Sequence, residues 1–269
     1  GIEDIQIVDP IAEEELLESY SKRLRESRKR KGVTLYEAKK LMKKREYFAS
    51  MMVESGDADA CISGLTIKYA SAVKPILEVI GTVKGATTVA GMYVLLTKHG
   101  PLFLADTTIN EEPTVAEIVE ITVNTAKSIA RTNLTPRIAL LSYSNFGSHK
   151  GEIPRKMHEA VAILQRDFPD LIVDGEMQAN FALDKDLLAE VFPFSNLVGQ
   201  RPNVFIFPNL AAGNIAYKLL QSFGALEAIG PLLIGVQKSA HVLQMGSSVR
   251  EIVNMTTLAV VDAQTRKQK

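Results

Sequence analysis

The run NVFIFPNLAAGNIAYKLLQSF, residues 203–223, contains one complete strand–loop–helix unit. Its apolar start is typical of a short buried strand, and the residues from Leu210 onward are typical of a helix. The proline, asparagines and glycine between these two parts predict a sharp loop. A buried strand that leads directly into a helix is the unit from which parallel α/β sheets are built.

The rest of the chain continues this alternation. Strands are expected at 58–64, 137–144, 171–177, 232–235 and 240–244. Helices are expected at 10–31, 34–55, 71–80, 114–132, 152–168 and about 249–262. Residues 87–109 predict a hairpin that turns at 99–101, and the charged tail 265–269 is expected to fray. The sequence therefore predicts an α/β fold of three layers, α/β/α, with a mostly parallel sheet.

Composition narrows the class of protein. The chain has 269 residues, equal numbers of basic and acidic side chains and one cysteine. Neutrality argues against a broad nucleic-acid surface, and the single Cys61 predicts a core residue in a reducing cytoplasm rather than a disulfide or a nucleophile. Neither a membrane-spanning run nor a signal peptide is recognisable. Because Gly1 is not a natural initiator, the sequence is expected to be part of a longer protein.

Several common chemistries have no motif in this sequence. We find no Gly-rich dinucleotide or nucleotide loop, no nucleophile elbow and no zinc-protease motif. The histidines lack the spacing of metal ligands. His158 is expected at the surface of a helix and His149 in an exposed loop. No metal site is therefore predicted.

Two loops are expected at the carboxyl ends of strands, where open α/β sheets bind ligands. Ser142–Ser148 offers hydroxyls and backbone N–H groups for a phosphate or carbonyl oxygen, although an ordinary strand-to-helix loop explains it about equally well. Pro208–Asn214 is the second loop. The basic run 27–32 is either a solvated helix end or a phosphate contact.

The stretch HVLQMGSSVREIV, residues 241–253, has the features of an active-site corner. Ser248 and Glu251 form a capping box that predicts the start of a helix, and Gly246 and Ser247 offer backbone N–H groups to an anion. Gln244 and Met245, however, supply neither a charge nor a nucleophile.

An ordered set of motifs resembles the phosphate acetyl/butyryl transferase family from about Asp9 to Gln264. It comprises ISGLT and VKPILEVI (62–80), LADTTINEEPTVAEIVEI (104–121), RIALLSYSNFGS (137–148), PDLIVDGEMQANFAL (169–183), NVFIFPNLAAGNIAYKLLQ (203–221), AIGPLLIG (228–235) and HVLQMGSSVREIVN (241–254). LSYSNFGS, VDGEMQA and VREIVNMTTLAVVDAQ look specifically like the phosphotransacetylase-like C-terminal domain of bacterial NADP-dependent malic enzymes. The family usually begins with a further β-α unit, which this sequence lacks.

The resemblance implies two subdomains with a cleft between them, residues 1–80 plus 232–269 and residues 81–231. It also implies that the last helix packs beside the N-terminal helices, which would bring Arg28, Lys74 and the 241–253 stretch to one cleft. The serine and arginine of the family's final motif correspond to Gln244 and Met245, and its carboxylate corresponds to Glu251. Acetyl-CoA or phosphate would be bound by Arg28, Lys74, Ser142, Ser144, Asn145, Phe146, Gly147, Ser148, Asn209, Asn214, Tyr217, Lys218 and Gln244.

Function follows from the same resemblance. Without the serine hydroxyl and the guanidinium we expect a domain that binds acetyl-CoA as an effector and does not transfer acetyl groups. It would regulate the oxidative decarboxylation of malate to pyruvate, which a catalytic domain outside this sequence performs with NADP and a divalent metal. The alternatives are an active phosphate acetyltransferase and a mainly structural role. A homodimer is implied, and no nucleic-acid or membrane partner is expected.

Overall fold

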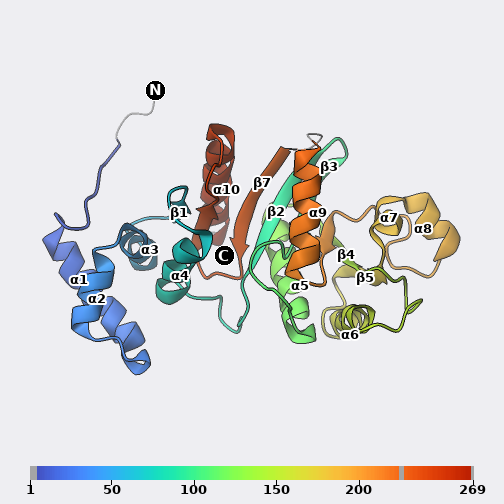
Figure 1. The fold of residues 1–269 in the computed structure, drawn as a ribbon, viewed down its shortest axis with the longest axis horizontal. Helices are drawn as coiled ribbons and strands as arrows, with labels where there is room; N and C mark the ends of the chain where they lie inside the picture. The colour runs from blue at the N-terminus through green and yellow to red at the C-terminus, as the bar shows by residue number, and fades with distance from the viewer. Residues whose placement is uncertain (1–4, 224–226, 268–269) are drawn as a thin grey trace.

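The computed structural model describes residues 5–223 and 227–267. Two sheets organise the chain (Figure 1). A small parallel sheet pairs β1 (Ala60–Gly64) with β8 (Ser239–Leu243), and a six-stranded sheet has the order β5-β4-β6-β3-β2-β7. We call the small sheet with α1–α4 and α10 the first lobe, and the large sheet with α5–α9 the second lobe.

The first lobe begins with helices, as its apolar spacing predicts. These helices are α1 (Glu14–Arg28), the 3₁₀ turn Lys29–Lys31, α2 (Leu35–Met42), α3 (Arg45–Ser55) and α4 (Tyr69–Val79). The single helix expected at 34–55 is wrong, because Lys44 is extended and separates α2 from α3. The break lets both short helices turn Met42 and Phe48 into one apolar cluster with Tyr20 and Leu24 of α1.

The second lobe confirms the strand–helix alternation. In chain order it contains β2 (Ala90–Thr97), β3 (Gly100–Ala105), α5 (Val115–Ala130), β4 (Arg137–Leu141), α6 (Glu152–Asp167), β5 (Ile172–Met177), α7 (Ala179–Leu183), α8 (Lys185–Val191), β6 (Val204–Ile206), α9 (Leu210–Ser222) and β7 (Glu227–Ile234). The expected hairpin is β2–β3, which is antiparallel, whereas β3, β4, β5 and β6 pair in parallel. The short helices α7 and α8 were not predicted.

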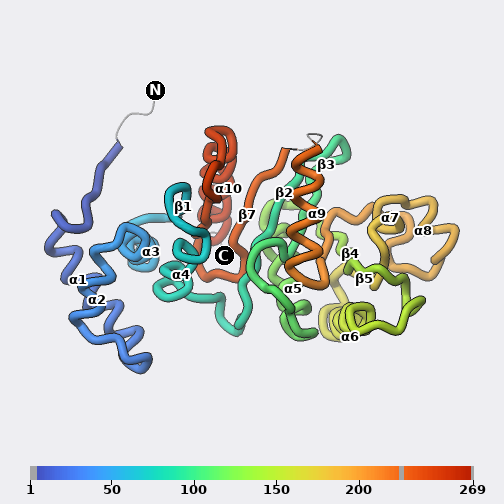
Figure 2. The backbone as a smooth tube through the Cα atoms, in the orientation of Figure 1, coloured from blue at the N-terminus to red at the C-terminus, as the bar shows by residue number. Residues whose placement is uncertain are grey.

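Alternating side chains send two separate cores to the two faces of the large sheet. Met92, Val94 and Phe103 face α5 and α6. Tyr93, Leu95 and Phe205 face α7, α8 and α9. This arrangement is the three-layer α/β/α fold expected from the sequence (Figure 2). The subdomain boundary expected after residue 231 falls within β7, which pairs with β2 on both sides of that point.

The last helix, α10 (Val249–Lys267), extends five residues beyond the expected end at Asp262. Its tail is not frayed up to Lys267, because Arg266 donates hydrogen bonds to Asp262 and to the carbonyl oxygens of Val236 and Gln237. The helix packs on β1, β7 and β8. It lies in the same lobe as the N-terminal helices, as expected, but α3, α4 and β1 lie between α10 and the α1–α2 pair (Figure 1). Residues 268 and 269 lie outside the described part.

No helix within the described residues is both long enough and apolar enough to cross a membrane.

Candidate ligand-binding site

The loop Ser142–Ser148 follows β4 and folds around a buried carboxylate. Oε1 of Glu176 accepts hydrogen bonds from the Ser144 hydroxyl at 2.9 Å and from the backbone N–H of Gly147 at 2.7 Å. The Glu176 side chain is fully buried, and its second oxygen, Oε2, has no hydrogen-bond partner among the described residues, so the two donors on Oε1 are what compensates its burial. The loop therefore directs its strongest donors toward the protein itself.

Other donors of this loop also pair with protein acceptors, in the loop itself or in β5. The N–H of Phe146 donates to the Glu176 carbonyl oxygen at 2.8 Å, and that of Asn145 donates to the Ser148 hydroxyl at 2.9 Å. The sequence predicted that these groups would face a ligand oxygen. In the structure these donors have acceptors within the protein. Glu176 was not identified from the sequence as one of those acceptors. No local signal distinguishes it, because β5 contains a second carboxylate, Asp174.

The start of α9 is anchored to the segment that follows β3. Asn209 caps the helix by accepting from the N–H of Ala212 at 3.0 Å, and its amide donates to Glu112 at 3.0 Å. The amide of Asn214 donates to the carbonyl oxygen of Thr107 at 3.1 Å. A Cβ on Gly213 would lie 2.3 Å from the carbonyl oxygen of Asp106. Glycine is therefore required where the helix and this segment approach each other.

Asp106 organises the segment after β3 in the way that Glu176 organises the loop after β4. Its carboxylate is buried and accepts hydrogen bonds from the N–H groups of Gly91, Thr108 and Asn110, at 2.9, 2.9 and 2.7 Å. Two buried carboxylates thus fix two loops at the same sheet.

Tyr217 and Lys218 are adjacent in α9 but have different environments. The Tyr217 ring is 2% exposed and stacks on Tyr93 with 3.9 Å between ring centroids. Lys218 is exposed, and its Nζ lies 5.3 Å from the Tyr217 centroid. Of these two predicted ligand contacts, only Lys218 presents its side chain to solvent.

The corner between β8 and α10 has the predicted capping box. The N–H of Ser248 donates to the Glu251 carboxylate at 2.6 Å, and the N–H of Glu251 donates to the Ser248 hydroxyl at 3.2 Å. Gln244 is half-buried, whereas Met245 is 65% exposed. The Glu251 carboxylate is thus committed to the helix start, and the Met245 side chain extends into solvent.

Tyr93 lies where the two lobes meet. Burial raises the pKa of Tyr93, and its hydrogen bond with Tyr217 and the charges of Tyr69 and Glu251 raise it further. Tyr69 begins α4, and burial together with the Asp106 carboxylate raises the pKa of its hydroxyl. That hydroxyl is buried without a hydrogen-bond partner among the described residues. The α10 corner, the α4 start and α9 therefore converge on one aromatic group.

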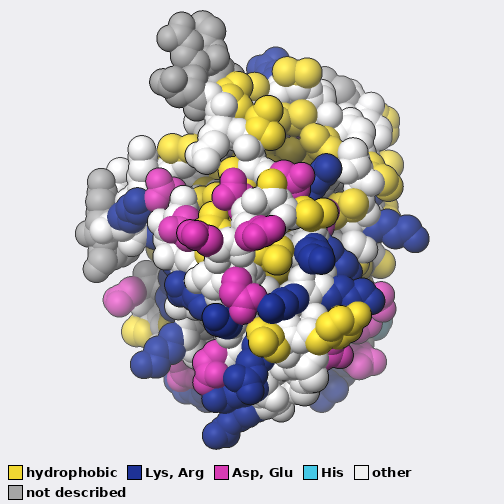
Figure 3. Space-filling view, turned by 90° about the vertical axis from the view of Figure 1, so that its left-hand side faces the viewer, with side chains coloured by type: hydrophobic (Ala, Val, Ile, Leu, Met, Phe, Trp, Pro, Cys, Tyr) yellow, Lys and Arg dark blue, Asp and Glu magenta, His cyan; other side chains and the backbone are white. Residues whose placement is uncertain are grey.

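Arg28 and Lys74 come together in a hollow of 440 Å³ on the first lobe. We call it the basic hollow; its walls carry the cations Arg28, Lys31, Lys40, Lys44 and Lys74 and the carboxylates Glu37 and Glu78. Arg28 donates to the Glu78 carboxylate at 3.3 Å, and Glu37 is engaged by its own capping box. Figure 3 views this end of the molecule and shows Lys and Arg side chains spread over the lower part of the face.

The predicted residues therefore form separate groups. Arg28 and Lys74 share the basic hollow, whose walls do not include the loop Ser142–Ser148, the start of α9 or the Gln244 corner.

The remaining chemical predictions concern single residues. Cys61 is buried, as predicted, and burial raises its pKa to about 11. His158 is exposed with Nδ1 3.4 Å from Glu176. Within the described ranges, no three His, Cys, Asp or Glu side chains gather as metal ligands.

Three layers, a mostly parallel sheet and loops anchored at its carboxyl edge define an α/β protein of the kind that binds ligands at strand ends. Residues 1–260 match the family model described as phosphate acetyl/butaryl transferase, so the chain belongs to that family.

Individual relatives carry two kinds of name. The phosphate acetyltransferase of Clostridium acetobutylicum is 37% identical over 254 residues, which cover 92% of this chain and 76% of that protein. The NADP-dependent malic enzyme of Escherichia coli is 40% identical over 240 residues, which cover 88% of this chain but only 32% of that protein.

Solved structures confirm the fold. The EutD phosphotransacetylase from Staphylococcus aureus superposes with a TM-score of 0.84 at 31% identity, over 98% of this chain and 80% of that one. A phosphotransacetylase from Streptococcus pyogenes gives 0.83 at 34% identity, over 98% and 77% of the two chains. The family membership expected from the sequence is therefore confirmed. Phosphate acetyltransferases and malic enzymes both match this chain, so the matches alone do not decide between the two activities.

Proposed function

We propose that this chain binds acetyl-CoA and that the basic hollow holds phosphate groups of the coenzyme. The observation that carries the proposal is the meeting of Arg28 and Lys74, which are distant in sequence, among an excess of cationic side chains. Guanidinium and ammonium groups bind phosphate through charge-assisted hydrogen bonds. The family resemblance assigns the same two residues to coenzyme and phosphate binding.

The activity that the comparisons favour at this site is acetyl transfer between coenzyme A and phosphate. The relatives whose length this chain covers to about three quarters are named phosphate acetyltransferases. In that reaction the coenzyme A thiolate attacks the carbonyl carbon of acetyl phosphate, and phosphate leaves with the electron pair of the broken C–O bond. It requires a group that takes the thiol proton and donors that stabilise the developing oxyanion.

A second candidate is acetyl-CoA binding without transfer, as an effector of an NADP-dependent malic enzyme. Gln244 and Met245 favour it, because neither side chain supplies the hydroxyl or the guanidinium of the family's final motif. Each lost donor for a developing charge typically costs about 3–4 kcal/mol of barrier. In this case NADP and a divalent metal act in another part of the polypeptide. The coupling free energy between acetyl-CoA binding here and the catalytic site there would be about 1–3 kcal/mol.

Calorimetric titration with acetyl-CoA and with dephospho-acetyl-CoA tests the binding proposal. We expect saturation below millimolar acetyl-CoA, weaker binding of the dephospho ligand, and about tenfold weaker acetyl-CoA binding by Lys74→Gln. Lys185→Gln, an exposed helical lysine on the second lobe, is the matched control and should bind as the unaltered chain does. A folded chain that shows no saturation at millimolar acetyl-CoA would overturn the proposal.

Acetyl-phosphate-dependent acetylation of coenzyme A then separates the two candidates. Turnover at rates typical of enzymes, roughly 1 per second or more, would establish the transferase. Binding without measurable turnover would favour the second candidate, acetyl-CoA binding without transfer.

A further inference from the structure

A cavity of 240 Å³ lies between α5 and α10, against the face of the six-stranded sheet that these helices cover. Met92, Val94 and Phe103 form its floor, Ile129 of α5 one wall, and Leu258 and Val261 of α10 the other. Strand alternation turns Tyr93 to the opposite face, where it meets α9. The cavity is therefore separate from the α9 and Gln244 groups described above.

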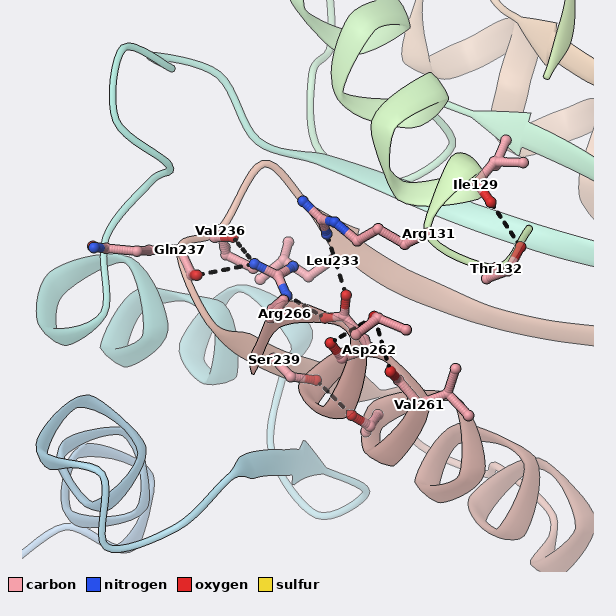
Figure 4. Close-up of polar contacts among 12 residues, drawn as sticks. Ile129, Arg131, Thr132, Leu233, Val236, Gln237, Ser239, Val261, Asp262 and Arg266 are labelled. Carbon is pink, nitrogen blue, oxygen red and sulfur yellow. Dashed lines mark hydrogen bonds and ion pairs between the residues drawn. The ribbon is translucent and has the colours of Figure 1, made fainter. Parts of the chain in front are cut away.

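One rim of this cavity is charged (Figure 4). Arg131, just after α5, donates to Asp262 of α10 at 3.2 Å, and Arg266 donates to the other oxygen of the same carboxylate at 2.8 Å. The side chain of Arg131 is 21% exposed, that of Arg266 18% and that of Asp262 16%. Two guanidinium groups share one carboxylate, so the rim retains a positive charge that is only partly screened by water.

A second cavity of 220 Å³ adjoins the first and shares Ser128, Arg131, Ile234 and Arg266 with it. Its lining adds Lys84 and Lys127 and contains no acidic side chain. Asn124 also lines it, and the amide Nδ2 of this residue is buried with no hydrogen-bond partner in the described part of the chain. This amide therefore offers a donor beside the cationic side chains of the hollow.

We propose that the two cavities together form a binding site for a small amphiphilic anion, with its apolar body in the first and a carboxylate or phosphate in the second. The apolar floor excludes a strongly hydrated ligand, and the surplus of cations excludes a cationic one. Arg131 stands at the junction and donates to the anion together with Lys127 and the Asn124 amide. A cavity of about 150 Å³ holds benzene, so 240 Å³ suits a body of roughly six to eight carbons.

Such a ligand contacts both lobes. Its apolar body touches β2, β3 and α5 of the second lobe and α10 of the first. Binding therefore stabilises the packing of α10 against the large sheet and raises the melting temperature in proportion to RT ln(1 + [L]/Kd). The site does not depend on acetyl-CoA binding, because neither Arg28 nor Lys74 contributes to it.

Calorimetry with octanoate and octyl phosphate tests this site, with n-octanol and acetate as ligands that lack the charge or the apolar body. We expect one equivalent of octanoate to bind at least tenfold more tightly than either control ligand. The stronger of the two anions identifies whether carboxylate or phosphate is preferred. Arg131→Gln should weaken binding about tenfold, since a charge-assisted hydrogen bond is lost. Arg155→Gln, an exposed arginine on α6, should leave it unchanged.

A second variant tests the apolar half. Val261→Phe fills the cavity and should abolish octanoate binding while leaving acetyl-CoA binding intact, and melting curves of both variants establish that they are folded. The proposal is overturned if octanol binds as tightly as octanoate, if several equivalents bind, or if a folded Arg131→Gln protein binds octanoate as the unaltered chain does.

Discussion

The backbone N–H of Gly147 donates to the carboxylate of Glu176 across 2.7 Å. In the sequence, the same N–H belongs to a loop expected to bind a ligand oxygen. The protein thus supplies its own anion at this position, and the loop is organised before any ligand arrives. A loop held in this way presents fixed groups to a ligand rather than closing around one.

Glu176→Gln should therefore destabilise the protein. The neutral amide keeps one acceptor but weakens the charge-assisted hydrogen bonds from Gly147 and Ser144, so we expect the free energy of unfolding to fall by about 2 kcal/mol. Urea denaturation measures this change. Glu190→Gln, an exposed carboxylate on α8, should stay within about 0.5 kcal/mol. Equal stability of the two variants would show that the buried carboxylate does not hold the loop.

His241 should make stability depend on pH. Burial lowers its pKa to about 4, although Asp262 favours the charged form. Nδ1 accepts from the N–H of Leu233 at 3.2 Å, which places the proton of the neutral ring on Nε2 near Ser239 and Asp262. The unfolded chain takes up a proton near pH 6.5 while the folded one does so only near pH 4.

Stability contributed by neutral His241 is thus complete above pH 6.5 and is lost as the pH falls toward 4. The loss amounts to about 3 kcal/mol. Denaturation of the unaltered chain and of His241→Gln between pH 7 and 4 isolates this residue, because all other titrating groups are common to both. We expect the difference between the two free energies of unfolding to shrink by that amount. A constant difference would contradict the lowered pKa.

Local patterns account for much of the fold. Thr114 and Glu117 form the capping box that starts α5. The β2–β3 hairpin is also present, although it turns at Lys98–His99, and Gly100 already pairs with Thr97 as the first residue of β3. These features depend on neighbours within a few residues, so the sequence is sufficient to predict them.

Long-range contacts account for what was missed. Arg266 extends α10 because carbonyl oxygens of the β7–β8 turn, distant in sequence, accept its hydrogen bonds. Helix periodicity runs through Lys43 and Lys44 without interruption, and only packing against α1 shows that the chain breaks there. Likewise, no local pattern shows that Glu176 will occupy the position that the loop after β4 offers to an anion.

We expect Tyr217 to contribute mainly to the stability of the core rather than to ligand binding. Its ring is buried against Tyr93, so Tyr217→Ala should cost about 3–5 kcal/mol of unfolding free energy, as aromatic truncation in a core does. Lys218→Ala, next to it and exposed, should change stability by less than about 0.5 kcal/mol. Thermal or urea unfolding of the pair tests this. A small loss for Tyr217→Ala would instead favour the ligand-binding role expected from the sequence.

The corner at Gln244 and Met245 offers a test of what acetyl transfer requires. Met245 is 65% exposed and Gln244 half-buried, and the capping box that follows them involves neither side chain. Gln244→Ser with Met245→Arg should therefore leave the fold intact while restoring a hydroxyl and a guanidinium. Because each preorganised donor is worth a hundredfold or more in rate, we expect kcat/KM for acetyl-phosphate-dependent acetylation of coenzyme A to rise at least tenfold. Gln244→Ser with Met245→Leu lacks the guanidinium and should gain less. If the unaltered chain already turns over as fast as the Ser–Arg variant, glutamine and methionine suffice at this corner and the chain is a transferase in its own right.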